Sequence, residues 1–359
     1  MDVEVEVANH VAFVTLNRPA ALNALSFAMI GELRRALDEA AGRADVRAVL
    51  MRGAGERAFC AGGDIRALYE DFRAGGTLHR DFFVEEYQLD YYLHRFPKPV
   101  VALLDGVVMG GGMGLGQAAP LRLVGERTRM AMPEVGIGLV PDVGGSYFLS
   151  RLPGALGVYL ALTGIEIRAA DALYAGLADL YFNAAGAAAL EPALRSLCWG
   201  DDARGDVAGA LRPLAVDPGA APLAPLRAAI DRHFSNASVA GILESLRAEA
   251  DPATAPWAHA TADLLLRRSP TMLAVALRQL RSGARLSLAD CFRMELVIVG
   301  RCFEQGDILE GVRALIIDKD KRPQWRPARL DDVDAASVDA FFSDPFPPGQ
   351  HPLARLGAD

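Results

Sequence analysis

The chain has 359 residues, of which 52% are hydrophobic and 23% are charged, and its formal net charge is −8. This length predicts roughly two domains of ~150 residues each, and the composition is that of a globular protein rather than a disordered one. The negative charge argues against nucleic acid and anionic membranes as partners, because both require a basic surface. An anionic substrate would need a local basic cluster.

The cysteines and the amino terminus indicate a reducing compartment. Cys60, Cys198, Cys291 and Cys302 form no CxxC pair and have no histidine at zinc spacing, so we expect free thiols and no metal site. Residues 1–7 alternate as a strand does, without the basic start and apolar run of a signal sequence. Because the sequence also lacks an apolar run of ~20 residues, we expect a cytoplasmic protein that does not enter the membrane.

The first half of the chain predicts alternating strands and helices. Residues 3–7 and 11–16 predict a hairpin. Ser26 is a candidate N-cap for a helix that ends near Gly42, with its apolar face on Met29, Ile30, Leu33, Leu37 and Ala40. Further strands are predicted at 46–51, 100–104, 121–125 and 129–132, and a second long helix at 78–95.

The second half predicts mainly helices. These are expected at 143–152, 156–163, 169–175, 270–281, 287–304 and 307–317, with a short strand near Leu180. Ser269, before Pro270, is a candidate N-cap of the helix that ends at Arg281, and Ser287 is a candidate N-cap of the helix that ends at Glu304. An Ala- and Pro-rich stretch predicts a loose connector at 206–225. The end of the chain, rich in Pro and polar residues, is expected to be irregular.

Two glycine-rich turns follow predicted strands. In Phe59–Ile65 the strand ends in small residues at Gly62-Gly63, and a helix is expected from about Asp64. In Met109–Gly114 three consecutive glycines, Gly110 to Gly112, precede another helix. Glycines at such junctions leave backbone N–H groups free to meet a ligand oxygen, although an ordinary strand-to-helix turn has the same pattern. Neither glycine motif of a nucleotide-binding loop is present.

Two acids stand among apolar residues in the stretch Met130–Gly145. Glu134 and Asp142 each follow a proline and are surrounded by small and apolar side chains. Desolvation raises the pKa of such carboxyl groups and suits them to proton transfer, but acids are also common as turn or capping residues. Glu86 lies in the apolar stripe of the helix at 78–95, either at its edge or lining a pocket.

These features combine into one chemical hypothesis. If both turns face one pocket, the amides of Gly63 and Gly111 can donate to a single oxygen and stabilise an oxyanion. Glu134 and Asp142 would then supply the acid–base or nucleophilic function. No Ser-His-Asp pattern competes for this chemistry, and we interpret the six scattered histidines as structural or solvent-facing.

The sequence resembles the crotonase (enoyl-CoA hydratase/isomerase) superfamily. The resemblance rests on Asn17-Arg18-Pro19, Asn23-Ala24-Leu25 and the two glycine turns. It implies an α/β fold, a spiral of ββα units capped by carboxyl-terminal helices, which binds acyl-CoA thioesters without a metal or redox cofactor and assembles as trimers or hexamers. The core would occupy 1–205 and the helical cap of the acyl-CoA site 226–327, with an irregular tail at 328–359.

Within this superfamily the chain is similar to the 3-hydroxyisobutyryl-CoA hydrolases of valine degradation. The supporting motifs are Glu85-Glu86-Tyr87, Met132-Pro133-Glu134, Pro141 to Gly145, Ser269-Pro270-Thr271, Leu277 to Leu280, Glu310 to Ala314, Ile317 to Asp320 and Pro323-Gln324-Trp325. The resemblance implies that Gly63 and Gly111 hold the thioester carbonyl, that Glu134 and Asp142 are catalytic, and that Glu86 contacts the substrate.

One position departs from the hydratase pattern. Hydratases carry a second glutamate where this chain has Gly114, so addition of water to a double bond loses one of its two acid–base groups. An enoyl-CoA isomerase, which can work with one carboxylate, and a non-catalytic acyl-CoA-binding protein stay open as alternatives. Arg18, Arg57, Arg66 and Lys319 are candidates for the CoA phosphates or plain surface charges, and the acyl specificity is left open.

Overall fold

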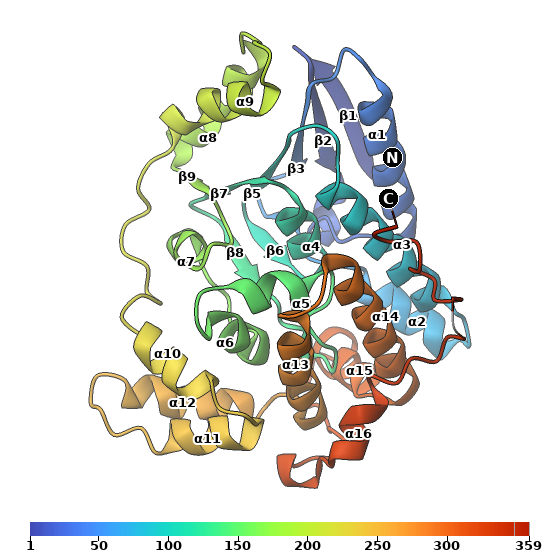
Figure 1. The fold of residues 1–359 in the computed structure, drawn as a ribbon, viewed down its shortest axis with the longest axis vertical. Helices are drawn as coiled ribbons and strands as arrows, with labels where there is room; N and C mark the ends of the chain where they lie inside the picture. Colours follow the sequence, from blue (N-terminus) through green and yellow to red (C-terminus); the bar gives the residue numbers. More distant parts are fainter. Residues whose placement is uncertain (348, 359) are drawn as a thin grey trace. The chain divides into compact units, whose positions relative to one another are not determined.

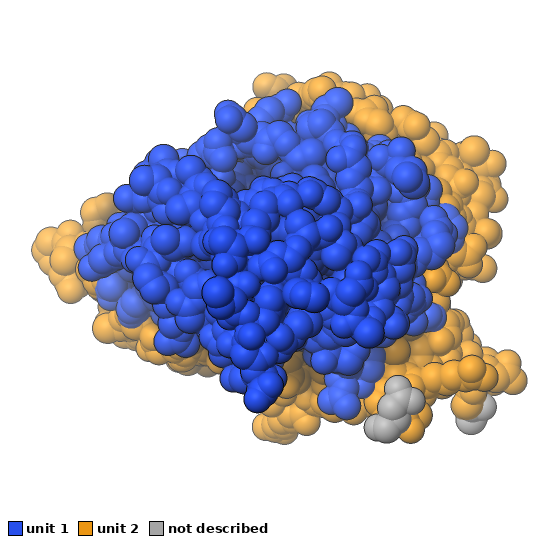
Figure 2. Space-filling model, turned by 90° about the horizontal axis from the view of Figure 1, so that it is seen from above, with its two compact units in different colours: residues 1–64, 88–131, 166–224 blue, residues 65–87, 132–165, 225–359 orange. Residues whose placement is uncertain are grey.

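The computed structural model describes residues 1–347 and 349–358, which form two compact units (Figure 2). Unit 1 comprises residues 1–64, 88–131 and 166–224, and unit 2 comprises 65–87, 132–165 and the chain from Pro225 on. Both units are therefore built from three separate stretches. Residues 65–87 and 132–165, which lie inside the predicted core range 1–205, group with the carboxyl-terminal helices.

Unit 1 contains two sheets, a larger and a smaller one (Figure 1). In the larger sheet, β1 pairs antiparallel with β2, as the predicted hairpin requires, and all further pairs are parallel. Its order is β1 (Val3–Ala8), β2 (Val11–Leu16), β3 (Ala48–Gly53), β5 (Val100–Leu104), β7 (Leu121–Gly125) and β9 (Leu180–Phe182). The smaller, parallel sheet contains β4 (Ala58–Cys60), β6 (Val107–Met109) and β8 (Arg129–Ala131). From β3 to β9, successive strands thus fall in alternate sheets, as the predicted spiral of ββα turns requires.

Five helices belong wholly to unit 1. They are α1 (Phe27–Gly42), α4 (Gly111–Ala118), α7 (Ala169–Ala175), α8 (Ala184–Arg195) and α9 (Ala203–Leu211). α1 matches its prediction: Ser26 accepts a hydrogen bond from the Met29 N–H, and the predicted apolar face is buried. α8 and α9 cover one face of the larger sheet, where Leu190, Leu194 and Val207 pack with Phe13 and Leu50.

Unit 2 is mainly helical. α10 (Arg227–Phe234), α11 (Val239–Arg247) and α12 (Ala255–Leu265) gather in one group (Figure 1). The unit also holds α2 (Ile65–Arg73), α5 (Gly145–Phe148), α6 (Leu156–Thr163), α13 (Pro270–Gly283), α14 (Leu288–Gln305), α15 (Ile308–Val312) and α16 (Ala335–Ala340). Ser269 and Ser287 cap α13 and α14 as predicted, by accepting from the N–H groups of Met272 and Asp290. α3 (Leu78–His94) begins in this unit and contributes its last residues to unit 1.

Several predicted boundaries differ from the structure. Residues 206–211 of the predicted connector lie in α9, because Asp202 caps this helix and Val207 and Leu211 bury against the sheet. The helix predicted at 143–152 begins only at Gly145, since Val143 and Gly144 have positive φ, and it tightens into a 3-10 turn at Leu149–Arg151. The tail is not wholly irregular, because Asp334 caps α16.

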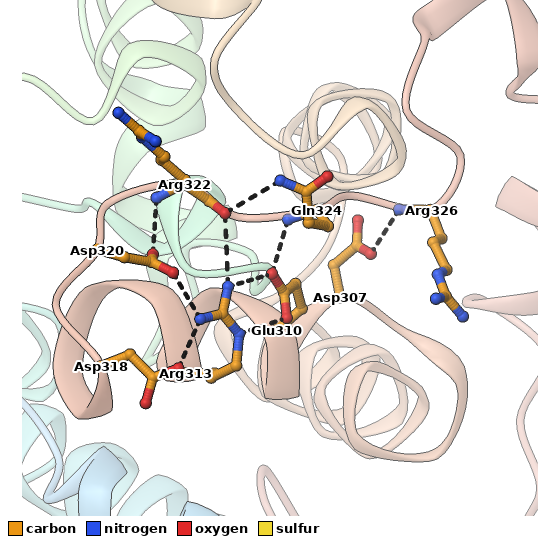
Figure 3. Close-up of polar contacts among 8 residues, drawn as sticks. All are labelled: Asp307, Glu310, Arg313, Asp318, Asp320, Arg322, Gln324 and Arg326. Atoms are coloured by element: carbon orange, nitrogen blue, oxygen red, sulfur yellow. Dashed lines mark hydrogen bonds and ion pairs between the residues drawn. The ribbon is translucent and has the colours of Figure 1, made fainter.

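The helix predicted at 307–317 is α-helical in its first part and π-helical in its second. After α15 a π-helical turn occupies Arg313–Ile317, and the chain then reverses through Lys319 and Lys321, both at positive φ. Arg313 holds this reversal: its guanidinium bonds the carboxylates of Asp318 and Asp320 at 2.6 and 2.7 Å and that of Glu310 at 2.7 Å (Figure 3). The Glu310 carboxylate in turn accepts from the Gln324 N–H. One cation thus organises the segment 318–324.

Candidate active site

The two glycine turns lie side by side in unit 1. β4 and β6 are parallel neighbours, so both turns leave the same edge of the smaller sheet. A Cβ added to Gly62, whose φ is +102°, would lie 3.1 Å from the Met109 carbonyl oxygen and 3.5 Å from the Gly111 nitrogen. A Cβ added to Gly112 would lie 2.2 Å from the Cys60 carbonyl oxygen. The close approach of the two turns therefore requires glycine at these positions.

The amides of Gly63 and Gly111 are available as donors. Leu25 bridges to this turn by donating to the Gly62 carbonyl and accepting from Asp64, which turns the Gly63 N–H away from Leu25. Gly111 is the first residue of α4, so its N–H has no acceptor within the helix. Within residues 1–347 and 349–358, neither N–H donates a hydrogen bond. The prediction that both turns expose an amide is therefore consistent with the local geometry.

Glu134 is a buried carboxyl group of unit 2. It opens a 3-10 turn, Glu134–Gly136, directly after β8 and Pro133, and its side chain is 5% exposed. In the described part of the chain its Oε2 atom has no hydrogen-bond partner. Burial, followed by the charge of Asp142, raises the pKa of Glu134 well above its usual value. An acceptor oxygen kept buried without a partner is costly and is a feature of functional sites.

Asp142 is the second buried carboxyl group and is held by a tyrosine. Its Oδ2 accepts a 2.6 Å hydrogen bond from the Tyr87 hydroxyl on α3, and its side chain is 4% exposed. Burial raises the pKa of Asp142 to about 6, while the bond from Tyr87 acts in the opposite direction. Burial, with the charge of Asp142 next, raises the pKa of Tyr87 well above 10, so this hydroxyl stays a donor. Glu86 is also buried, at 2% exposed.

The backbone after Asp142 is strained. Val143 has φ +53°, a conformation that β-branched residues rarely adopt, and Gly144 follows at φ +83°. Such strain costs on the order of 1–3 kcal/mol and persists only where the surroundings impose it. On the upstream side, the Gln279 amide donates to the Pro141 carbonyl at 2.7 Å. The strained turn thus sets the direction in which Asp142 leaves the backbone.

Two residues of this arrangement were not among the predicted site residues. Tyr87 belongs to the motif Glu85-Glu86-Tyr87, from which the sequence predicts no role for the tyrosine. Glu295, 0% exposed on α14, accepts from the Gly144 and Ser146 N–H groups at 2.7 and 2.8 Å and from the Ser146 hydroxyl. The signal for Glu295 was present in the sequence, because Phe292, Ile298 and Val299 surround it at helical spacing, as apolar residues surround Glu86.

The predicted site residues therefore form two groups. Gly63 and Gly111 lie on adjacent turns of unit 1, and Glu134 and Asp142 interact electrostatically in unit 2, where Glu86 precedes Tyr87. Their catalytic and substrate-binding roles stay predictions. Two of the suggested phosphate ligands are occupied: Arg18 pairs with Asp64 at 3.1 Å and Asp2 at 3.5 Å, and Arg66 donates to the Ile316 carbonyl.

Cysteines and histidines contribute little to this arrangement. All four cysteines are free thiols, as predicted. Buried His79 stacks on Phe303, and the ring nitrogens of His233 bond Ser245 and Glu249. In residues 1–347 and 349–358, no cluster of three or more His, Cys, Asp or Glu side chains could hold a metal ion. None of the helices described has the length and apolar character needed to cross a membrane.

Comparison with known proteins places the chain in a family. The family model described as "Enoyl-CoA hydratase/isomerase" matches residues 11–342. This chain belongs to that family. The fold and the resemblance predicted from the sequence are therefore confirmed.

Curated relatives and solved structures of the family match nearly the whole chain. The mitochondrial 3-hydroxyisobutyryl-CoA hydrolase of Danio rerio is 41% identical, covering 95% of this chain and 89% of the relative. The 3-hydroxyisobutyryl-CoA hydrolase 1 of Arabidopsis thaliana is 38% identical, covering 95% and 91%. The crystal structure of a carnitinyl-CoA dehydratase from Mycobacterium thermoresistibile superposes with a TM-score of 0.88 at 42% identity, covering 97% of both chains. The relatives thus carry names of different reactions.

Proposed function

We propose that this chain hydrolyses 3-hydroxyisobutyryl-CoA to 3-hydroxyisobutyrate and CoA, a step of valine degradation. The observation that carries the proposal is the buried pair of Glu134 and Asp142, in a chain that is similar to curated hydrolases over 95% of its length. Burial raises the pKa of both acids, which suits them to exchange protons with water or substrate near neutral pH.

We assign the amides of Gly63 and Gly111 to the thioester carbonyl. Two backbone donors stabilise the negative charge that develops on this oxygen when a nucleophile adds to the carbonyl carbon. Each donor of this kind is worth on the order of 3 kcal/mol in the transition state. The proposal is supported by the adjacency of the turns and by the absence of another acceptor for these amides in the described residues.

Glu134 acts on the carbonyl carbon by one of two routes. As a nucleophile, its carboxylate forms a C–O bond, the C–S bond breaks, CoA leaves as a thiolate, and water then hydrolyses the resulting mixed anhydride. As a general base, it removes a proton from water while the water oxygen bonds the carbonyl carbon and the thiolate leaves. Labelled water oxygen found in Glu134 after a single turnover would exclude the pure general-base route.

In this proposal Asp142 and Glu86 bind the substrate hydroxyl group or the attacking water. Asp142 accepts from Tyr87 through one oxygen, which leaves its other oxygen to accept from the substrate hydroxyl or from the attacking water. Glu86 contributes a second acidic contact to the substrate. Binding energy of the β-hydroxyl group would thereby be used to orient the thioester for attack.

Hydration or dehydration is the competing reaction, since the solved relatives carry those names. The crystal structure of an enoyl-CoA hydratase from Rhodobacter sphaeroides 2.4.1 is 39% identical to this chain, with a TM-score of 0.85 and coverage of 96% and 97%. Gly114 argues against this reaction here, because α4 provides no second carboxylate at that position. Hydrolysis needs only one attacking group and a thiolate that leaves without a proton.

Release of free thiol separates the candidate reactions. Purified protein is mixed with 3-hydroxyisobutyryl-CoA, other β-hydroxyacyl-CoA thioesters and an unsaturated thioester, and the free thiol is titrated. We expect CoA release from the branched β-hydroxy thioester. Loss of the double bond of the unsaturated thioester, or movement of that bond, without thiol release would instead identify a hydratase or an isomerase. Binding without any turnover would indicate a non-catalytic acyl-CoA-binding protein.

The coarser features of this function follow the family. An acyl-CoA thioester as the ligand is consistent with the family. A trimer or hexamer, a cytoplasmic location, and turnover without a metal or redox cofactor are parts of the proposal. The Danio rerio relative is named as mitochondrial, so fractionation of the native cell would test the location.

A further inference from the structure

Glu295 is a buried acid that lies far along the chain from every predicted site residue. It nevertheless contacts the turn that follows Asp142. It lies in the middle of α14 and accepts three hydrogen bonds, from the Gly144 N–H, the Ser146 N–H and the Ser146 hydroxyl. Burying a carboxyl group is expensive unless hydrogen-bond partners surround it. The donors here all come from one short turn, so the interaction holds this turn to the helix.

The turn needs such support because its backbone is strained. Val143 and Gly144 both have positive φ, and an unsupported Val143 would relax toward an extended or helical conformation. Relaxation would rotate the peptide groups on either side of Val143 and would redirect the Asp142 side chain. Its bond to the Tyr87 hydroxyl would then be lost.

Three elements hold the turn from different sides. α13 holds the Pro141 carbonyl through Gln279, α3 holds the Asp142 carboxylate through Tyr87, and α14 holds the following amides through Glu295. Of these, only Glu295 bonds the backbone after the strained residue. We propose that Glu295 is a positioning residue for the hydrolysis: it fixes the Val143–Ser146 turn and thereby the direction of Asp142. This inference rests on the proposed function for its kinetic consequence, although the anchoring of the turn can be measured without substrate.

The test compares Glu295→Gln with Glu304→Gln. Both replacements lie on α14, and Glu304 is a solvent-exposed partner of Arg301. Glutamine keeps the volume of Glu295 but presents an NH₂ group in place of one of the two carboxyl oxygens that accept backbone N–H groups, so one backbone N–H loses its acceptor. We expect kcat to fall on the order of tenfold or more, as for other supporting residues of active sites.

Hydrogen exchange supplies the readout that does not need activity. We expect faster exchange over residues 141–148 in Glu295→Gln than in Glu304→Gln, with the rest of unit 2 unchanged. Exchange that is equal in both variants would overturn the anchoring and with it the proposal. Faster exchange with an unchanged kcat would overturn the positioning role and leave a purely structural one.

Ser146→Ala covers the case in which Glu295→Gln does not fold. It removes only the hydroxyl donor and leaves both N–H bonds to Glu295. We expect a smaller fall in kcat and a smaller rise in exchange over the same residues; wild-type values for both would refute the proposal. A wild-type protein that releases no CoA would refute the proposed function, while the exchange comparison would still decide whether Glu295 anchors the turn.

Discussion

Burial governs the acid–base chemistry of the candidate site at the scale of single residues. Glu134, Asp142 and Glu295 are all buried, and burial is the largest cause of the raised pKa of each. Burial raises the pKa of Asp142 to about 6 against the opposing effect of the Tyr87 hydrogen bond, and it raises the pKa of Glu295 to about 8 against the opposing effect of the Ser146 and Gly144 hydrogen bonds. Differences of this kind allow neighbouring carboxyl groups to take different roles.

Tyr87→Phe should move the acidic limb of the pH–rate profile to higher pH. The Tyr87 hydroxyl favours the charged form of Asp142, so its removal raises the pKa of Asp142 above its present value of about 6. The ring contacts with Phe83 and Phe292 are kept. The measurement is kcat/KM against pH, with Tyr174→Phe, an exposed tyrosine of α7, as the control. A shift toward lower pH would contradict the assigned hydrogen bond.

Glu295→Gln should also change how stability depends on pH. The pKa of Glu295 is about 8 in the folded protein and about 4.5 when unfolded, so the folded state retains a proton that the unfolded state loses. The destabilisation of the folded state by Glu295 is absent below pH 4.5 and grows as the pH rises toward 8. The free energy of unfolding of the wild type, relative to the variant, should therefore decrease from pH 5 to pH 8. Denaturant titrations at both pH values measure it, and an increase would show that the carboxylate form is favoured by folding.

The sequence located the candidate acids but not their supports. Glu134, Asp142 and Glu86 were singled out because each is an acid in an apolar setting, and all three are buried. The sequence does not predict the roles of Tyr87 and Glu295, because these roles depend on partners that are distant along the chain. Tyr87 lies 55 residues from Asp142, and Glu295 lies 151 residues from Gly144. A sequence pattern reports the spacing along one helix and does not report which loop that helix meets.

At the scale of elements, local signals predicted the helices with clear caps and faces. Ser26, Ser269 and Ser287 are the N-caps of α1, α13 and α14, as the sequence predicts. The Ala-rich helix α8 was missed, since its sequence carries little apolar periodicity and its place is decided by Leu190 and Leu194 packing on the larger sheet. The reversal after Arg313 was also missed, because it depends on ion pairs between residues five and seven positions apart.

The contact between the two glycine turns can be tested by overpacking. In Gly112→Ala the added methyl group would lie 2.2 Å from the Cys60 carbonyl oxygen, so β4 and the start of α4 must separate. We expect a loss of about 1–3 kcal/mol in the free energy of unfolding and a fall in kcat, because Gly111 moves with the turn. Gly209→Ala in α9 is the control, since nothing lies within 4 Å of its added carbon and alanine favours helix. Wild-type stability and kcat in Gly112→Ala would contradict the close approach.

The Arg313 cluster should act on local order more than on activity. Arg313→Ala removes the cation shared by Glu310, Asp318 and Asp320 and leaves three acids facing one another. We expect faster hydrogen exchange over residues 318–324 and a small decrease in the free energy of unfolding, since solvent screens these ion pairs. Arg329→Ala, which removes an exposed pair with Asp331, is the matched control. Equal exchange in the two variants would show that the cluster does not hold the segment.

At the scale of the whole molecule, family membership establishes the fold but does not establish which reaction is catalysed. Relatives that match more than nine-tenths of this chain carry the names of a hydrolase, a dehydratase and a hydratase. A fold shared among several reactions does not decide between them. The decision rests on single positions, here a glycine at 114 and acids at 134 and 142.

Release of CoA from 3-hydroxyisobutyryl-CoA by the wild type and by Glu134→Gln tests the central claim most directly. Glu39→Gln, an exposed acid of α1, serves as the control for the substitution itself. We predict rapid thiol release by the wild type and by Glu39→Gln, and a loss of at least about a hundredfold in Glu134→Gln, since general acid–base groups contribute 10²–10⁴-fold. Undiminished thiol release by Glu134→Gln would contradict the account.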